Sequence, residues 1–176
     1  MELLDQNGLT EAQAIAEYRK KNYPKPGLTA DIVIFRRRDK DTEVLLIRRG
    51  GHPFLGKWAT PGGFANQNEP IETTAARELQ EETGIEGLAL HLVDVFSAPG
   101  RDPRGWTVSA AYYALIDHDV PVRAGDDAAE TRWFTLGRED GALVLTSGGL
   151  RLRPADLAFD HAEILTKAIA AAGLSL

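Results

Sequence analysis

One segment, Gly63 to Ile85, constrains this chain most, because it predicts a short helix that gathers negative charge on one face. Pro70 suits a first helical turn, and Gly84 suits the position just past the last one, so we expect a helix from about Pro70 to Thr83. At about 100° per residue, three of its glutamates fall within an arc of roughly 100°. They are Glu78, Glu81 and Glu82. The neighbouring apolar stripe, Ala75, Ala76 and Leu79, would dock on a sheet.

Carboxylates this close repel one another, so we expect a positively charged group to bind at this helix face and offset the repulsion. Arg77 can pair with Glu81 at i,i+4 spacing but cannot neutralise all three glutamates. A hard divalent cation such as Mg²⁺ can, because it takes oxygen ligands and is commonly held by one or two carboxylates together with substrate phosphates. The preceding Pro61-Gly62-Gly63 lets a backbone carbonyl come close to such an ion. The alternative is a solvated acidic helix face.

The spacing of this segment resembles the box of the Nudix hydrolase family, G-x5-E-x7-R-E-U-x-E-E-x-G-U, where U is aliphatic. Every position matches: Gly63, Glu69, Arg77, Glu78, Leu79, Glu81, Glu82, Gly84 and Ile85. At ordinary residue frequencies, a chance match in about 150 windows is on the order of 10⁻⁷. The resemblance implies an enzyme that hydrolyses a nucleoside diphosphate linked to another moiety.

The resemblance also implies a fold and roles for residues. The fold is an α/β (α+β) class α/β/α sandwich with a mixed central sheet. Glu78, Glu81 and Glu82 would be metal ligands, Gly62 would add a backbone carbonyl, and Arg77 would orient the glutamates. The cofactor would be Mg²⁺, with Mn²⁺ as a possible substitute.

Hydrolysis also needs a group that accepts a proton from water. We expect Glu82 or Glu78 to be this base. Asp127 or Asp126, in the loop before Trp133, is a further ligand or the alternative base. The same two aspartates are also compatible with a solvated turn.

The substrate must be inferred from the loops around the box. Pro99 lies 99 − 85 = 14 residues after Ile85, similar to the downstream proline of the ADP-ribose pyrophosphatase subgroup. Arg101 and Arg104 follow in a loop stiffened by Gly and Pro, and an arginine fork suits phosphate oxygens. Arg48, with Arg49 and Lys57, can add positive charge near a diphosphate. The late segments Arg132-Trp133-Phe134 and Leu157-Ala158-Phe159-Asp160-His161 also resemble that subgroup.

We therefore expect a Mg²⁺-dependent hydrolase that cuts ADP-ribose to AMP and ribose 5-phosphate. One alternative is a pyrophosphohydrolase for a deoxynucleoside triphosphate or another nucleoside diphosphate sugar. The other is a non-catalytic ADP-ribose sensor, since Nudix-like domains also occur in regulators that carry a DNA-binding domain. Against a sensor, the box keeps every acidic residue, and only 176 − 133 = 43 residues follow Trp133.

Composition limits the remaining classes. The chain has 20 Lys+Arg, 26 Asp+Glu and no cysteine, so thiolate metal sites and a cysteine nucleophile are excluded. Its net charge of −6 argues against a nucleic-acid partner, and no apolar run reaches the roughly 18 residues of a membrane span. We expect a cytoplasmic protein that binds a small nucleotide, with a homodimer suggested by the subgroup. None of the four dispersed histidines is expected to ligate metal.

Local patterns predict the remaining elements. Residues 1–27 should form an extension, with a helix from Glu11 to about Lys21 capped by Thr10, ahead of a Nudix domain at 28–176. Strands are expected at 29–35 and 43–48 as a hairpin, then at 88–97, 106–116 and 131–136. A last helix should begin near Asp160, with Asp160 and Glu163 as a capping box, and run to about Ala172.

Overall fold

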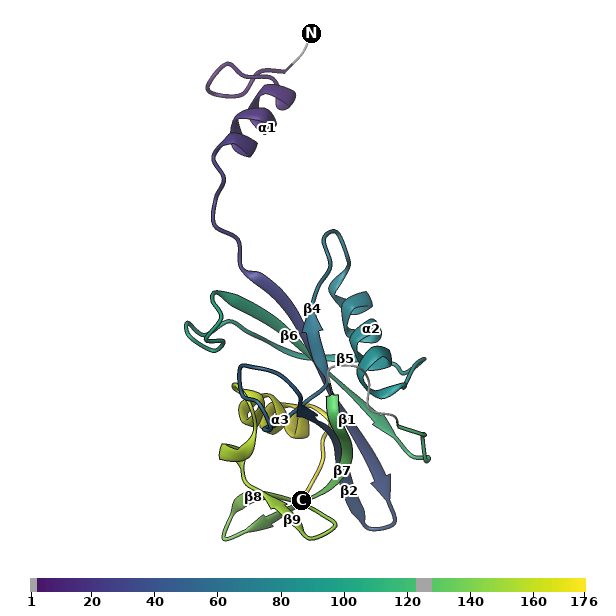
Figure 1. The fold of residues 1–176 in the computed structure, drawn as a ribbon. Coiled ribbons are helices and arrows are strands. Elements are labelled where there is room, and N and C mark those ends of the chain that lie inside the picture. The colour runs from purple at the N-terminus through teal and green to yellow at the C-terminus, as the bar shows by residue number, and fades with distance from the viewer. Residues whose placement is uncertain (1–2, 123–127) are drawn as a thin grey trace.

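The fold is built on one mixed sheet, seen in a computed structural model that describes residues 3–122 and 128–176 (Figure 1). The order across the sheet is β5 (His91–Phe96), β6 (Thr107–Ile116), β1 (Gly27–Arg38), β2 (Asp41–Arg49), β7 (Ala128–Glu139), β8 (Ala142–Ser147) and β9 (Leu150–Leu152). Two short strands, β3 (Trp58–Ala59) and β4 (Gly62–Phe64), pair with β2 and β1 respectively. The β1–β6 pair is parallel and the other pairs are antiparallel, so the expected mixed sheet is confirmed.

Helices cover both faces of the sheet. Side chains alternate between faces along a strand, and β1 is buried on both. Ala30, Ile32 and Ile34 belong to one apolar cluster, with Ala75 and Leu79 of α2 (Ile71–Thr83). Val33 and Phe35 belong to the other cluster, which contains apolar residues of α3 (His161–Ala171). The layers therefore form the expected α/β/α sandwich.

The strands that the sequence missed are the short β3 and β4 and the hairpin after β7. The hairpin β1–β2 is confirmed, with Arg38 opposite Asp41, and β5 and β6 lie close to their expected ranges. In contrast, β7 extends beyond 131–136 at both ends, and the hairpin β8–β9 was not expected. Its signal is the apolar run 143–145, bounded by the turn residues Asp140-Gly141 and Gly148-Gly149. A 3₁₀ turn, η1 (Pro154–Asp156), then leads to α3.

Three local expectations about helix ends and faces are wrong. Pro70 is the N-cap of α2, with extended backbone, and is not in its first turn. Ala76 is exposed, and Thr74 is buried in its place beside Ala75. The Asp160 side chain makes no capping bond to α3, because its carboxylate pairs with Arg101 instead.

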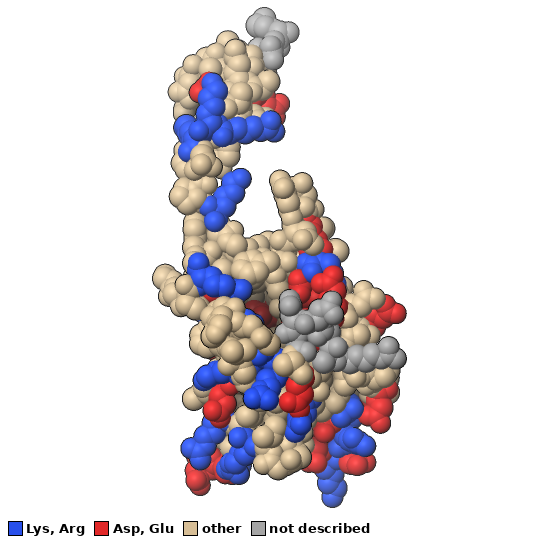
Figure 2. Space-filling model, viewed as in Figure 1, with Lys and Arg blue, Asp and Glu red and all other residues tan. Residues whose placement is uncertain are grey.

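The N-terminal extension stands away from the sheet (Figure 1). Its helix α1 (Glu11–Lys20) has the expected capping box, in which Thr10 and Gln13 exchange bonds of 2.9 and 3.3 Å. No residue of α1 is buried. Figure 2 shows basic side chains on this extension, where the sequence holds Arg19, Lys20, Lys21 and Lys25. The described part of the chain has no helix long and apolar enough to cross a membrane.

Candidate functional site

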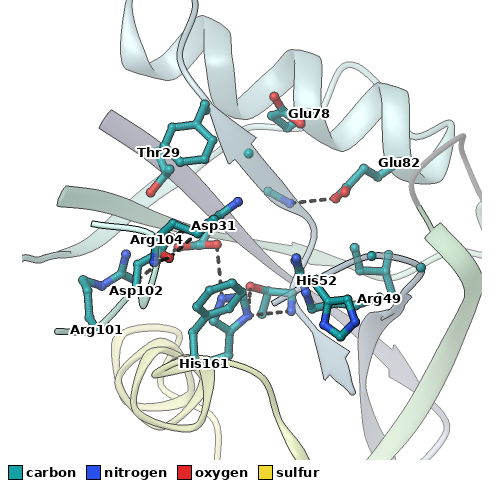
Figure 3. Close-up of a pocket in the computed structure, with 18 of the residues that line it drawn as sticks. Thr29, Asp31, Arg49, His52, Glu78, Glu82, Arg101, Asp102, Arg104 and His161 are labelled. Atoms are coloured by element: carbon teal, nitrogen blue, oxygen red, sulfur yellow. Dashed lines mark hydrogen bonds and ion pairs between the residues drawn. The ribbon is translucent and has the colours of Figure 1, made fainter. Parts of the chain in front are cut away.

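A cavity of about 520 Å³ opens between α2, β4, the start of α3 and the loop at 99–105 (Figure 3). This volume falls within the range of small-molecule sites. Glu78 and Glu82 of α2 form one wall. The other polar side chains on its surface, apart from His52, fall into two groups. The first is cationic and comprises Arg49, Arg101 and Arg104; the second is neutral or acidic and comprises Thr29, Asp31, Thr60, Asp102 and His161.

The acidic wall follows from how α2 docks. Ala75 and Leu79 pack onto the sheet, which turns the adjacent face of the helix toward β4 and the cavity. Glu82 Oε2 accepts a 2.8 Å hydrogen bond from the Gly62 backbone N–H, drawn in Figure 3. Burial raises the pKa of the Glu78 carboxyl above its ordinary value, although Arg77 opposes the shift. A higher pKa makes a carboxylate a better proton acceptor.

Two glycines allow the backbone to approach this wall. A Cβ on Gly63 would lie 2.5–2.6 Å from the carboxyl atoms of Glu78. A Cβ on Gly62 would lie 2.3 Å from the carbonyl oxygen of Ala30. The bare backbone that the sequence predicted at these positions is therefore required by contacts on both sides.

Arg77 fixes the acidic residues around it. Its guanidinium donates to Glu69 at 3.0 Å, to Glu78 at 2.5 Å and to the carbonyl oxygen of Phe64 at 2.9 Å. The predicted pairing with Glu81 is confirmed at 2.9 Å. The hydrogen bonds from Arg77 lower the pKa of Glu69 to about 2. Glu81 is 58% exposed and lies outside the cavity lining, although it shares Nη1 of Arg77 with Glu78.

The oxygen donors of Glu78 and Glu82 fit a divalent ion whose other ligands come from the substrate and from water. Among the residues that the structure describes, no three carboxylate or imidazole side chains converge closely enough to hold a metal by themselves. Mg²⁺ does not require such a cage, since one or two carboxylates plus phosphate oxygens and water suffice. Glu78 and Glu82 supply hard oxygen donors in one cavity, beside the closely packed backbone of Gly62.

Arg101 lies on the cavity surface, where its guanidinium is already engaged by carboxylates of the chain. Its side chain is 6% exposed, and it donates to both carboxylate oxygens of Asp160, at 2.8 and 2.7 Å. A second carboxylate, that of Asp31, also faces this guanidinium, with its Oδ2 3.7 Å from Arg101 Nη2. Burial lowers the pKa of Arg101, but its pairing with Asp160 more than offsets this, so the pKa stays above its ordinary value. The Arg101 guanidinium, which was expected to contact phosphate, thus links the 99–105 loop to Asp160, the N-cap residue of α3.

Replacing Asp160 by asparagine should destabilise the fold. The change removes the carboxylate that Arg101 contacts most closely and leaves Asp31, at 3.7 Å, as its nearest counter-charge. Breaking a buried ion pair in this way typically costs about 3–5 kcal/mol. Thermal and urea denaturation would measure the loss. Asp156→Asn is the matched control, because that carboxylate is exposed and pairs with no cation in the described structure. Equal stability of D160N and the unsubstituted chain would contradict this role for Arg101.

Arg104 and Arg49 also bring positive charge to the cavity. Arg104 is held by Asp102 through Nε and Nη2, and its guanidinium lies 4.9 Å from the Phe64 ring and 5.6 Å from the Phe159 ring. Arg49 lies 4.9 Å from the same Phe159 ring. Arg48 was expected here, but its side chain lies outside the cavity lining and donates to the carbonyl oxygen of Gly56.

Both arginines were considered from the sequence, and the structure places Arg49 but not Arg48 in the cavity lining, because adjacent strand residues face opposite ways. The register of β2 against β7 also shifts between Arg48 and Arg49. Pro99 is exposed and lies outside the cavity lining. Asp126 and Asp127 lie outside the described residues.

Sequence analysis missed the buried polar residues beneath the cavity. Asp31 accepts a 2.5 Å hydrogen bond from Ser109, and His161 Nδ1 lies 3.0 Å from both the backbone nitrogen and the hydroxyl of Thr60. The signal for Asp31 was available, because it is one acid within the apolar run 30–35. The contacts of Phe159 with Arg49 and Arg104 could not be predicted, because they join segments that lie far apart in the chain.

Comparisons with known proteins agree with this geometry. A family model described as NUDIX domain matches residues 25–146. The chain is 36% identical to an ADPR responsive transcriptional repressor NtrR from Acinetobacter baylyi, over 93% of the chain and 61% of the repressor. It is 35% identical to an ADP-ribose pyrophosphatase from Methanocaldococcus jannaschii, over 81% of the chain and 73% of that protein.

A solved structure is also similar. It is the NUDIX domain of Shewanella oneidensis NrtR complexed with ADP ribose, with a TM-score of 0.74 and 30% identity. The match covers 93% of this chain and 99% of that one. The chain therefore spans nearly all of that isolated domain, but less than two thirds of the curated repressor.

Proposed function

Because this chain belongs to the NUDIX family, we propose that it is a Mg²⁺-dependent hydrolase that cleaves the diphosphate of ADP-ribose to AMP and ribose 5-phosphate. One observation carries the proposal: Glu78 and Glu82 line the same cavity as Arg49 and Arg104. Carboxylates suited to a divalent ion thus stand beside cations suited to an anionic ligand, which is the arrangement that a metal-bridged diphosphate requires.

The described side chains have distinct tasks in this reaction. Arg104 and Arg49 offset the negative charge of the diphosphate, which otherwise repels an attacking oxygen. Glu78 and Glu82, with the Gly62 carbonyl, would hold the ion, and Arg77 keeps Glu78 in place. When bound, a divalent ion neutralises phosphate oxygens and lowers the pKa of a coordinated water. Glu81 and Asp127 remain proposed as a further ligand and as an alternative base.

Water then supplies the new oxygen on phosphorus. Glu82 or Glu78 accepts the proton that this water loses, and the bond between that phosphorus and the bridging oxygen breaks. The bridging oxygen leaves with the other phosphate, so one water and one ADP-ribose give AMP and ribose 5-phosphate. No oxidant or further reactant is needed.

The decisive experiment is a substrate panel in Mg²⁺ in which products are identified by mass spectrometry. We expect AMP and ribose 5-phosphate from ADP-ribose, and no reaction in EDTA. Release of inorganic pyrophosphate from a deoxynucleoside triphosphate, with ADP-ribose left intact, would favour the other pyrophosphohydrolase. Cleavage of a different nucleoside diphosphate sugar in preference to ADP-ribose would also contradict the substrate assignment.

Replacing Arg104 by alanine should weaken substrate binding more than it slows turnover. The change removes a cation from the cavity wall, which for a contact with a charged group is worth about 1.5–3 kcal/mol, or roughly ten- to a hundredfold in KM. Steady-state kinetics with ADP-ribose would measure it. Arg37→Ala is the control, because Arg37 is exposed on β1 away from the cavity lining. An unchanged KM in R104A would remove Arg104 from the substrate site.

A second candidate function is ADP-ribose sensing without turnover. It is favoured by the similarity to the A. baylyi repressor and to the ADP-ribose-bound NUDIX domain. Binding of ADP-ribose in Mg²⁺ with no product after prolonged incubation would support it. We propose catalysis first, because Glu78, Glu82 and the glycines packed against them are all in place.

We also propose that the partner is a small nucleotide and not a nucleic acid or a membrane, and that two copies associate through residues 1–27. A ten-residue helix is marginally stable alone in water, and α1 buries none of its residues against the sheet. Its exposed Ile15 and Tyr18 offer apolar surface to a second copy. The cytoplasmic location expected from the sequence stays a prediction.

A further inference from the structure

A buried histidine joins the last helix to the segment that carries Gly62. His161 opens α3 and is 4% exposed. Its Nδ1 lies 3.0 Å from the backbone nitrogen of Thr60, a residue 101 positions earlier. A backbone N–H can only donate, so Nδ1 must accept, and the proton of the neutral ring is on Nε2. Burial lowers the pKa of His161, which is consistent with a neutral ring.

The other side of the imidazole ring faces Asp31. Nε2 lies 3.5 Å from Asp31 Oδ1, as the dashed line in Figure 3 marks. Ser109 donates a 2.5 Å hydrogen bond to the second oxygen of Asp31. The ring is also stacked against Phe159, with centroids 5.4 Å apart. Contacts from Thr60, from Asp31 of β1 and from Phe159 before α3 therefore define the orientation of the ring, and Ser109 of β6 holds Asp31.

The segment from Thr60 to Gly62 is held at each residue by a different layer of the fold. Thr60 donates to His161 of α3, and the Pro61 carbonyl accepts a 2.8 Å bond from Ile32 of β1. Gly62 donates to Glu82 of α2 at 2.8 Å. These bonds fix two peptide groups, the one between residues 59 and 60 and the one between residues 61 and 62. The Gly62 carbonyl belongs to the next peptide group, which starts at the Gly62 Cα that these bonds hold in place and continues into the pairing of Gly63 with Ala30 of β1.

We propose that His161 is a positioning residue that sets the backbone of residues 60–63, so that Gly62 presents its carbonyl to the ion and its N–H to Glu82. This inference rests on the metal site of the proposed function. Groups behind metal ligands commonly change metal affinity by about 10–100-fold.

Two polar substitutions separate positioning from simple packing. Asparagine at 161 can place its side-chain oxygen near Nδ1, where Thr60 donates, whereas glutamine places its polar atoms near Nε2, toward Asp31. We expect His161→Asn to bind Mn²⁺ within about threefold of the unsubstituted chain and His161→Gln to bind it about tenfold or more weakly. Electron paramagnetic resonance of free Mn²⁺ measures this without turnover.

Two further measurements complete the test. Calorimetry with ADP-ribose in EDTA should give similar dissociation constants for both variants, because the arginine wall is unchanged. Thr60→Val, which keeps the backbone donor and nearly the volume of the side chain, should also bind Mn²⁺ like the unsubstituted chain. This variant keeps the proposal falsifiable if His161→Gln does not fold.

Several outcomes would overturn the positioning role. Equal Mn²⁺ affinity in the asparagine and glutamine variants would do so, as would a tenfold loss in Thr60→Val or no Mn²⁺ binding by the unsubstituted chain. Failure of the proposed function is distinguishable, because a chain that binds Mn²⁺ but releases no AMP still gives the comparison between asparagine and glutamine.

Discussion

Glu82→Gln is expected to lower turnover of ADP-ribose about a thousandfold, since it removes a charged oxygen that would hold the ion or accept the proton from water. The fold should survive. The glutamine oxygen can still accept the bond that the Gly62 N–H donates, and the side chain is only half-buried at the edge of the cavity. The measurement is kcat in saturating Mg²⁺, with circular dichroism and Tm to verify folding.

The control for this change is Glu72→Gln on the same helix. Glu72 is exposed in the first turn of α2, outside the cavity lining, so the substitution alters helix charge without touching the site. It should turn over ADP-ribose normally. If E82Q kept near-normal kcat, the acidic wall could not be the reaction centre. If E82Q and E72Q lost activity equally, the loss would reflect helix charge alone.

Gly63→Ala should have the second largest effect, and it should act on activity without unfolding the chain. The new Cβ would meet the Glu78 carboxyl group at 2.5–2.6 Å. This group is the end of a flexible side chain, so it can rotate away without moving the backbone, at the cost of its hydrogen bond from Arg77. The displaced carboxylate would then leave the cavity wall, and we expect kcat/KM to fall about a hundredfold or more.

Alanine substitutions at two other glycines serve as comparisons for Gly63→Ala. Gly62→Ala meets the backbone oxygen of Ala30 at 2.3 Å, and a strand backbone cannot move aside cheaply, so this variant should lose Tm as well as activity. Gly137→Ala has open space around its Cβ and should be silent in both measurements. A G63A variant with full activity would show that the position of Glu78 is unimportant. One that unfolds like G62A would show that the contact is structural.

The acidic wall could be predicted because its determinants are local. All of them lie within one helix and its C-cap: the carboxylates of Glu78 and Glu82, the apolar Ala75 and Leu79 beside them, and Gly84, where the helix ends. Helical periodicity converts that spacing into a shared face without knowledge of any other segment. The hairpin β1–β2 and the capped helix α1 were predictable for the same reason.

The cationic wall could not be predicted in the same way. Sequence alone offered Arg48, Arg49, Arg101 and Arg104 to a phosphate. The structure places Arg49 but not Arg48 in the cavity lining, and it pairs Arg101 with Asp160, 59 residues away. An arginine in a loop has the same local signature whether it meets a ligand or an internal carboxylate. Packing of α3 against the sheet decides between them.

What the sequence by itself determined is therefore the chemistry of one helix: carboxylates on one face, glycines beside them, and Arg77 within reach. Only the tertiary structure decided what surrounds that helix, including the bond between His161 and Thr60, 101 residues apart. The physical reason is range. Helix geometry relates residues three or four positions apart, whereas a buried polar group takes whichever partner the packed layers bring to it.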